Sequence, residues 1–111
     1  MKSWHTIQER KVIRKYHGKP LVKYGYDGLL NGRPVEVRSV REDSRYRLQK
    51  NIHRYLIRKN GSYIFVNKRG RTKRISAKKV SGLLGNGNWF FDRKHKYDHR
   101  FLTPKKVFNR R

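Results

Sequence analysis

The chain contains no cysteine, which excludes disulfide bonds, cysteine-ligated zinc sites and thiol nucleophiles from its chemistry. Acidic residues are also scarce, with seven Asp and Glu among 111 residues. The sequence has no long apolar run, and its first residues lack the apolar segment of a secretion signal. We therefore expect an intracellular, cytoplasmic protein with no membrane partner, whose chemistry depends on carboxylates, histidine or lysine.

Positive charge is abundant, with 31 Lys and Arg giving a formal net charge of +24 that extends over the whole chain. Such a charge density binds phosphates before any base is read, so nucleic acid is the expected partner. The length fits one domain, residues 1–111, with one modest core. A short basic run is expected to contact the nucleic acid, although such a run can equally be a solvated surface: Lys68, Arg69, Arg71, Lys73 and Arg74.

Hydrophobic periodicity and turn residues predict alternating strands and helices. The expected helices are residues 4–16, 49–59 and 77–84, and the expected strands are 21–30, 34–40, 45–48, 62–66 and 71–76. The order of hairpin, helix and strand predicts that the strand at 62–66 returns parallel to the hairpin. The aromatic run at 89–91 is expected to be extended and buried, with base stacking as the alternative, and the tail from Arg93 has no clear pattern.

The dipeptide at 31–32, Asn-Gly, favours a two-residue type I′ turn between the first two strands. This turn places Leu30 opposite Arg33, and three steps further back it places Asp27 opposite Glu36. Two carboxylates that face each other across strands repel and destabilise the pair. In a chain so rich in cations, the pattern predicts a divalent metal ion between Asp27 and Glu36.

The order of these residues resembles the PD-(D/E)XK nuclease superfamily, especially its small archaeal Holliday-junction-resolvase-like members. The matching positions are Glu9 on the first helix, Asp27 in the hairpin, Glu36-Val37-Arg38 on its second strand, and the helix that starts around Gln49-Lys50. The resemblance covers roughly residues 4–67. It implies an α/β, restriction-endonuclease-like fold: a central mixed sheet with a β-hairpin and flanking helices.

The same resemblance implies a chemistry. The carboxylates of Asp27 and Glu36, with the backbone carbonyl of Val37, would hold Mg²⁺ or Mn²⁺ and activate water for attack on a phosphodiester bond. Glu9 would lie close by as a further ligand. The implied substrate is DNA in preference to RNA, with branched DNA bound by a homodimer.

Arg38 departs from the family pattern, which usually has lysine at this position. A guanidinium stays protonated, so Arg38 can orient groups or stabilise charge on the phosphate but cannot accept a proton from water. Some relatives take the functional cation from the following helix, which makes Lys50 a candidate substitute and Gln49 a candidate for orienting the water. The predicted catalytic set is therefore Glu9, Asp27, Glu36, Arg38 and Lys50.

Each of these residues also has a structural interpretation. Thr6 and Glu9 match a capping box, in which Glu9 serves only its own helix. Asp27 can be a turn residue beside Gly28, and Glu36 can pair with one of the many arginines. The alternative function is a non-catalytic nucleic-acid-binding protein, either a decayed nuclease fold or a ribosomal-type RNA binder.

Overall fold

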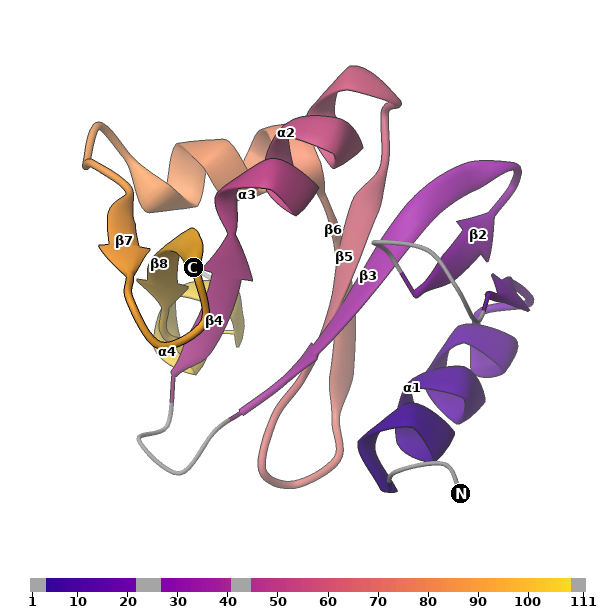
Figure 1. The fold of residues 1–111 in the computed structure, drawn as a ribbon. Helices are drawn as coiled ribbons and strands as arrows, with labels where there is room; N and C mark the ends of the chain where they lie inside the picture. The colour runs from indigo at the N-terminus through magenta and orange to yellow at the C-terminus, as the bar shows by residue number, and fades with distance from the viewer. Residues whose placement is uncertain (1–3, 22–26, 41–44, 109–111) are drawn as a thin grey trace.

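The computed structural model describes residues 4–21, 27–40 and 45–108 (Figure 1). Its helices are α1 (Trp4–Lys15), α2 (Lys50–Arg58), α3 (Ala77–Leu84) and α4 (Pro104–Phe108). Its strands are β1 (Lys19–Pro20), β2 (Gly28–Leu30), β3 (Arg33–Ser39), β4 (Tyr46–Gln49), β5 (Ser62–Val66), β6 (Thr72–Ser76), β7 (Phe90–Asp92) and β8 (Tyr97–Leu102). The predicted ends of β5 and α3 are confirmed to the residue.

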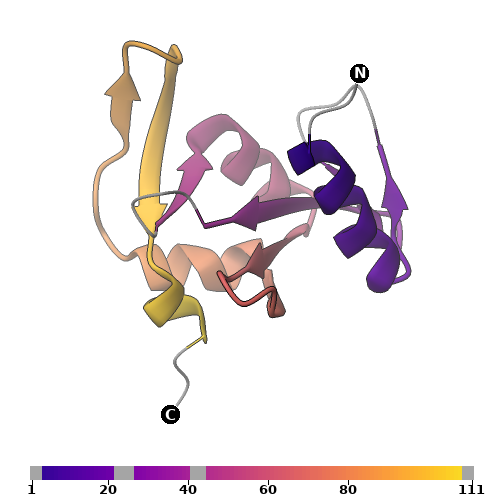
Figure 2. The ribbon, with the colours of Figure 1, turned by 90° about the horizontal axis from the view of Figure 1, so that it is seen from below.

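Two sheets organise the chain. The larger has the order β1-β2-β3-β5-β6, and the smaller has the order β4-β8-β7. β3 and β5 pair in parallel, as predicted, whereas the other neighbouring strands pair antiparallel. Seen from below, α1 and the smaller sheet lie at opposite sides of the molecule (Figure 2). The predicted α/β architecture, a central mixed sheet with a hairpin and flanking helices, is confirmed.

The hairpin between β2 and β3 has the predicted turn and register. Asn31 and Gly32 both have positive φ, 52° and 76°, as a type I′ turn requires. Leu30 lies opposite Arg33, as predicted. The first hairpin strand is shorter than expected, because β2 starts at Gly28; residues 22–26 of the predicted strand lie outside the described ranges.

Helix α1 covers one face of the larger sheet. Val12 and Ile13 pack there in a buried cluster that also contains Leu30, Val35, Val37, Ile64 and Val66. The helix approaches the hairpin so closely that a Cβ on Gly28 would lie 2.9 Å from Cδ1 of Ile13 and 2.6 Å from the carbonyl oxygen of Lys19. Only glycine, which has no Cβ, fits at position 28 without moving these atoms. Residue 28 therefore lies directly against α1 and β1.

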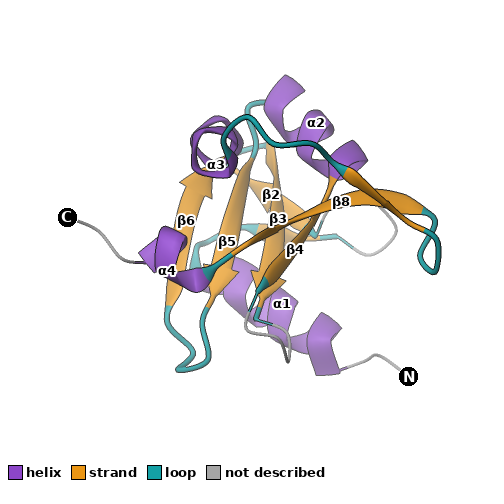
Figure 3. Ribbon diagram, turned by 90° about the vertical axis from the view of Figure 1, so that its left-hand side faces the viewer, coloured by secondary structure: helices purple, strands orange, loops and turns teal. Residues whose placement is uncertain are grey.

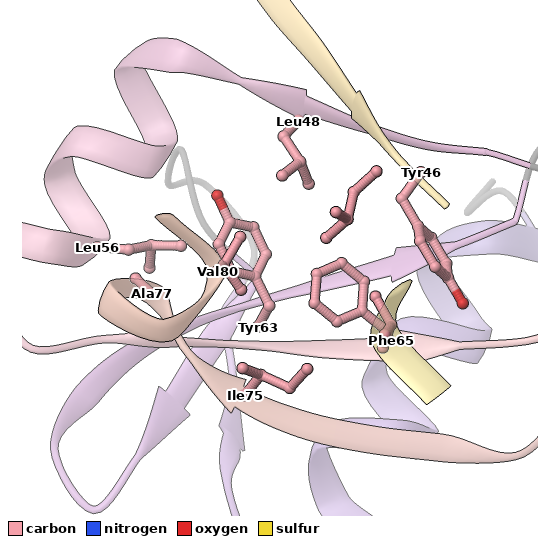
Figure 4. Packing of buried hydrophobic residues seen from close by; sticks show 10 residues of the cluster. Tyr46, Leu48, Leu56, Tyr63, Phe65, Ile75, Ala77 and Val80 are labelled. Atoms are coloured by element: carbon pink, nitrogen blue, oxygen red, sulfur yellow. The ribbon is translucent and has the colours of Figure 1, made fainter. Parts of the chain in front are cut away.

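The opposite face of the larger sheet carries a second buried cluster (Figure 4). It contains Tyr46, Leu48, Leu56, Tyr63, Phe65, Ile75, Ala77, Val80, Leu102 and Val107. These residues come from both sheets and from α2, α3 and α4, and Figure 3 shows β4 and β8 crossing in front of the larger sheet with α1 behind it. The second half of the chain thus packs on the face that α1 leaves open.

Buried His53 lies within this second cluster with both ring nitrogens hydrogen-bonded. Nδ1 lies 2.9 Å from the hydroxyl of Tyr63, and Nε2 lies 2.8 Å from the hydroxyl of Ser81. Burial, together with the charge of Arg100, lowers the pKa of His53. This histidine is therefore a neutral structural bridge between α2, β5 and α3.

The predicted burial of the aromatic run at 89–91 is wrong for two of its three residues. Trp89 packs partly against the second cluster, but Phe90 and Phe91 are 64% and 60% exposed. They lie on β7, which is at the edge of the smaller sheet and pairs with β8 on one side. The unassigned tail forms β8 and α4, and no helix in the described part of the chain is long and apolar enough to span a membrane.

Candidate active site

Strand β3 separates the two buried clusters and presents a different chemistry to each. Val35 and Val37 pack against α1, whereas Glu36 points to the other face of the sheet. There the register of β3 with β5 places Glu36 beside Tyr63. Glu36 is 3% exposed, so its carboxyl group is removed from water.

Asp27 reaches the same place from the residue just before β2. Its amide donates to the carbonyl of Val35 (3.0 Å), although Gly28 is the residue paired with Val35 in the ladder. Two residues thus lie against one, as in a β-bulge, and the simple opposition of Asp27 and Glu36 that we predicted is replaced by this offset. Oδ2 of Asp27 accepts a hydrogen bond from the amide of Val37 (2.7 Å), which aims the carboxylate toward Glu36.

The electrostatics of the pair follow from burial. Burial raises the pKa of Glu36 well above its usual value; Arg38 opposes the shift, and the charges of Asp27 and Glu9 add to it. Burial also raises the pKa of Asp27, against the hydrogen bond from Val37 and the charge of Arg38. The interaction between the two carboxyl groups further raises the pKa of Glu36 and lowers that of Asp27. Such a pair favours uptake of a proton or of another cation.

Arg38 is the positive group at this site. Its Nη2 donates to Oε2 of Glu36 in an ion pair, and its Nε is buried and makes no hydrogen bond with the described residues. Burial acts to lower the pKa of the guanidinium, but the carboxylates of Glu36 and Asp27 outweigh burial and raise it. Arg38 therefore stays protonated. The structural interpretation in which Glu36 pairs with an arginine is also seen in this structure.

Glu9 lies on α1, half-buried, and is close enough to raise the pKa of Glu36. A capping box would require Thr6 to lie just before the first turn of the helix. Because α1 begins at Trp4, the capping-box interpretation does not fit. The structure thus brings Glu9, Asp27, Glu36 and Arg38 into one electrostatic cluster.

The cluster offers oxygen donors to a metal ion. Among the described residues, no three His, Asp or Glu side chains converge closely enough to hold one. Asp27 and Glu36 supply two carboxylates, and Oε1 of Glu36 is buried and accepts no hydrogen bond from the described chain. The amide of Val37 points toward Asp27, so the carbonyl of the same residue leaves β3 on that side too. Hard oxygen donors of this kind fit Mg²⁺ or Mn²⁺.

The structure places Gln49 at the end of β4 and Lys50 at the start of α2. Gln49 ends β4, whose alternate residues face the core, and its own side chain points to the other side. Lys50 opens α2, and its Nζ lies 3.9 Å from Oδ2 of Asp98 on β8. Both residues therefore belong to the smaller sheet and its surroundings.

The basic run at 68–74 is divided among three environments. Lys68, Arg69 and Arg71 are exposed in the loop between β5 and β6, which Asn67 closes by accepting from the amides of Arg69 (3.0 Å) and Arg71 (2.9 Å). Lys73 is half-buried and donates to the carbonyl of Val107 (2.8 Å). Arg74 follows Lys73 on β6, so its side chain points to the opposite face of the strand, where its Nε donates to the hydroxyl of Ser62. The basic run is therefore not one continuous surface.

Tyr63 is the residue at this site that sequence reasoning missed. Burial and the nearby charge of Glu36 raise its pKa, so its hydroxyl keeps its proton. The hydroxyl joins His53, which connects the carboxylate cluster to the second buried cluster. In the sequence, the strand at 62–66 is a nearly continuous apolar run, in which no residue stands out as a site residue. Only the pairing of β5 with β3 shows that Tyr63 lies beside Glu36.

A comparison with protein families assigns almost the whole chain to a superfamily. A family model described as a PD-(D/E)XK nuclease superfamily domain matches residues 2–109 of the chain. Members of this superfamily are generally nucleases, which implies a nucleic-acid substrate, and they typically use Mg²⁺ or Mn²⁺. No curated protein matches the chain.

The raised pKa values predict that Asp27 destabilises the metal-free protein. A carboxyl with a raised folded pKa gives a native state that loses stability as pH rises from about 4 through that folded pKa. Asp27→Asn keeps the acceptor for Val37 and removes the charge, so in EDTA at pH 8 it should raise the melting temperature. An effect of about 1 kcal/mol corresponds to roughly 4 °C in a domain of this size.

The gain from Asp27→Asn should shrink as pH falls to about 4, where both proteins are neutral at this position. Asp92 provides a control of opposite sign, because a hydrogen bond from His95 lowers its pKa to about 2. Asp92→Asn should therefore lower the melting temperature at pH 8. Thermal unfolding followed by circular dichroism measures both, and a lower melting temperature for Asp27→Asn at pH 8 would contradict the electrostatic description.

Proposed function

Because the chain belongs to the PD-(D/E)XK nuclease superfamily, we propose that it is a metal-dependent endonuclease that cleaves phosphodiester bonds of DNA. The observation that carries the proposal is the meeting of Asp27 and Glu36 in a chain that has only seven acidic residues. One buried oxygen of Glu36 accepts no hydrogen bond from any residue that the structure describes. Repulsion between buried carboxylates is costly, and a divalent ion would relieve it.

The residues that would hold Mg²⁺ or Mn²⁺ are Asp27 and Glu36 through their carboxylates and Val37 through its carbonyl. The bound ion would supply a Lewis acid that lowers the pKa of water and stabilises charge on the phosphate. Glu9 adds negative charge beside these ligands, which favours a divalent over a monovalent cation. The bulge at Gly28 and the hydrogen bond from Val37 keep Asp27 in position before any ion binds.

Arg38 takes the place of the family lysine in this proposal. It remains protonated, so it binds the scissile phosphate and stabilises the charge that develops there, and it does not remove a proton from water. Its Nε makes no hydrogen bond with the described part of the chain and is a donor that a phosphate oxygen would satisfy. The proton from the attacking water then passes to a carboxylate or to solvent.

The exposed part of the basic run provides a place for the rest of the substrate. Ser39 and Val66, the last residues of β3 and β5, are paired. The loop at 67–71 therefore begins at the end of the sheet where β3 also ends. From Glu36 to Ser39 the strand rises about 10 Å, which equals roughly three base pairs of duplex at 3.4 Å each. Lys68, Arg69 and Arg71 would hold phosphates at that distance from the cleaved bond. Branched DNA and a homodimer remain part of this proposal.

One observation favours the alternative of a non-catalytic nucleic-acid-binding protein. The ion pair of Arg38 with Glu36 neutralises part of the charge that a metal ion would balance, and a guanidinium cannot replace a lysine in proton transfer. A decayed nuclease fold or an RNA-binding protein would retain the basic surface. Cleavage assays with binding measured in parallel separate the two functions.

We expect the protein to cleave supercoiled or four-way-junction DNA in Mg²⁺ or Mn²⁺, and EDTA to stop the reaction. Glu36→Gln should lower the cleavage rate at least about a hundredfold, equivalent to about 2.7 kcal/mol of transition-state stabilisation, while DNA binding remains. Arg38→Lys should retain or raise the rate, because lysine also binds phosphate and can exchange its proton.

Two variants serve as controls for cleavage. Asp92→Asn removes a carboxylate that pairs with Arg47 in the smaller sheet, and Arg33→Lys changes an exposed arginine at the hairpin turn. Both should cleave like the unmodified protein at temperatures where they are folded. If the unmodified protein and Arg38→Lys were both inert on every DNA tested, the non-catalytic alternative would replace this proposal, and RNA would be the next ligand to test.

DNA affinity should fall steeply with salt, because each phosphate contact releases counterions from the DNA. Each contact contributes about −0.9 to the slope of log K against log salt, so losing one makes the slope shallower by about 0.9. Replacing Lys68, Arg69 and Arg71 together by alanine should reduce the slope by up to roughly 3. The matched control replaces exposed Lys59, Lys78 and Lys79, which lie near the opposite ends of β5 and β6. Equal slopes for the two triple variants, measured by fluorescence anisotropy, would rule out a special role for the loop.

A further inference from the structure

Two neighbouring phenylalanines of β7 are exposed without covering any described part of the core. Phe90 is 64% and Phe91 is 60% exposed. Successive side chains of a strand point to opposite faces, so the two rings lie on opposite sides of the smaller sheet. The pairing of β7 with β8 places Phe90 beside His99 and Phe91 beside Asp98. The two rings therefore meet different surroundings.

Phe91 lines an open pocket of about 410 Å³ between α2 and the hairpin of β7 and β8. The other lining residues are Lys50, Asn51, Arg54, Lys96, Tyr97 and Asp98. Figure 3 shows α2 passing beside β8, so the pocket lies between two packed elements of the fold. Its size is within the usual range for small-ligand sites.

The side chains of this pocket combine an aromatic ring with an excess of positive charge. Lys50, Arg54 and Lys96 supply three cations against the single carboxylate of Asp98. Lys50 is 3.9 Å from that carboxylate, and both side chains are more than a third exposed, so Lys50 is available to an anion. Asn51 adds an amide that can both donate and accept hydrogen bonds.

We propose that this pocket binds one unpaired nucleotide of the nucleic-acid substrate, with its base stacked on Phe91 and its phosphates held by Lys50 and Arg54. Bases stack on exposed aromatic rings, and arginine and lysine hold the backbone beside them. The inference rests on the nucleic-acid part of the proposed function and is independent of the metal site. It gives Lys50 a binding role beside Asp98, where the structure places its side chain.

This site determines the form of substrate that the protein prefers. A base inside a duplex must first be unstacked and unpaired, at a cost that a base in a gap or at a branch does not incur. DNA with an unpaired base should therefore bind more tightly than a fully paired duplex of the same length and charge. The preference comes from the smaller sheet, whereas the basic loop acts on any duplex.

The test uses the full chain in EDTA and a duplex with one unpaired 2-aminopurine, compared with the fully paired duplex. Stacking in the pocket should quench the 2-aminopurine fluorescence of the unpaired probe. Phe91→Ala should abolish the quenching and weaken binding of that probe by roughly 5- to 150-fold, the range of measured base stacking, with the paired duplex unaffected. Phe91→Trp should restore both signals, and Lys50→Gln should weaken the unpaired probe only.

Phe90→Ala is the matched control, because Phe90 is the equally exposed neighbour on the other face of β7. It should leave both signals unchanged. Equal losses for Phe90→Ala and Phe91→Ala, or no loss for either, would overturn the pocket assignment. So would sedimentation showing that Phe91→Ala separates two copies of the chain while nucleotide binding is intact, since the pocket would then be a protein interface.

The same titrations distinguish this inference from the proposed function. Salt-dependent binding of both DNAs without any preference for the unpaired base contradicts the pocket alone. Failure to bind either DNA contradicts the pocket and the proposed function together. Normal preference for the unpaired base in a protein that never cleaves DNA supports the pocket and rejects the endonuclease.

Discussion

The burial of Glu36 in the central strand, between Arg38 and Asp27, is the constraint on which the rest of the structure depends. Charged groups removed from water cost several kcal/mol each, and one ion pair does not offset two neighbouring carboxylates. The strand tolerates this cost because its other face, Val35 and Val37, is held by α1, and because the second cluster packs around Tyr63. The apolar side chains of β3 therefore hold in place the strand that carries Glu36, and the site lies on the central strand of the larger sheet.

The same arrangement separates chemistry from substrate contact. The carboxylates lie on β3 and just before β2, where hydrogen bonds from the backbone and the close approach at Gly28 hold them. Most of the exposed cations lie elsewhere: in the loop at 67–71, beyond the ends of β3 and β5, and around the pocket at the start of α2. The two carboxylates thus lie on or beside strands, whereas exposed loops and helix ends carry most of the positive charge. A nucleic acid that contacts both regions must extend past the ends of β3 and β5.

Local patterns predicted the part of the site that depends on local geometry. Asn31-Gly32 set the hairpin register through turn conformation, and strand periodicity placed Glu36 and Arg38 on the face opposite Val37. The bulge before Gly28 was not predictable, because it comes from contact with Ile13 and Lys19. The proximity of Lys50 to Asp98 and the exposure of Phe91 were not predicted, for a related reason. Both features depend on β7 and β8, which join β4 from the far end of the chain, and the sequence around 93–102 has no periodic signal.

The most direct test of the account is anomalous diffraction from crystals of the protein grown with Mn²⁺, recorded near the manganese absorption edge. We predict a manganese peak between the carboxylates of Asp27 and Glu36, with the carbonyl of Val37 as a third ligand. The absence of a manganese peak beside these two carboxyl groups at saturating Mn²⁺ would contradict the proposed metal site.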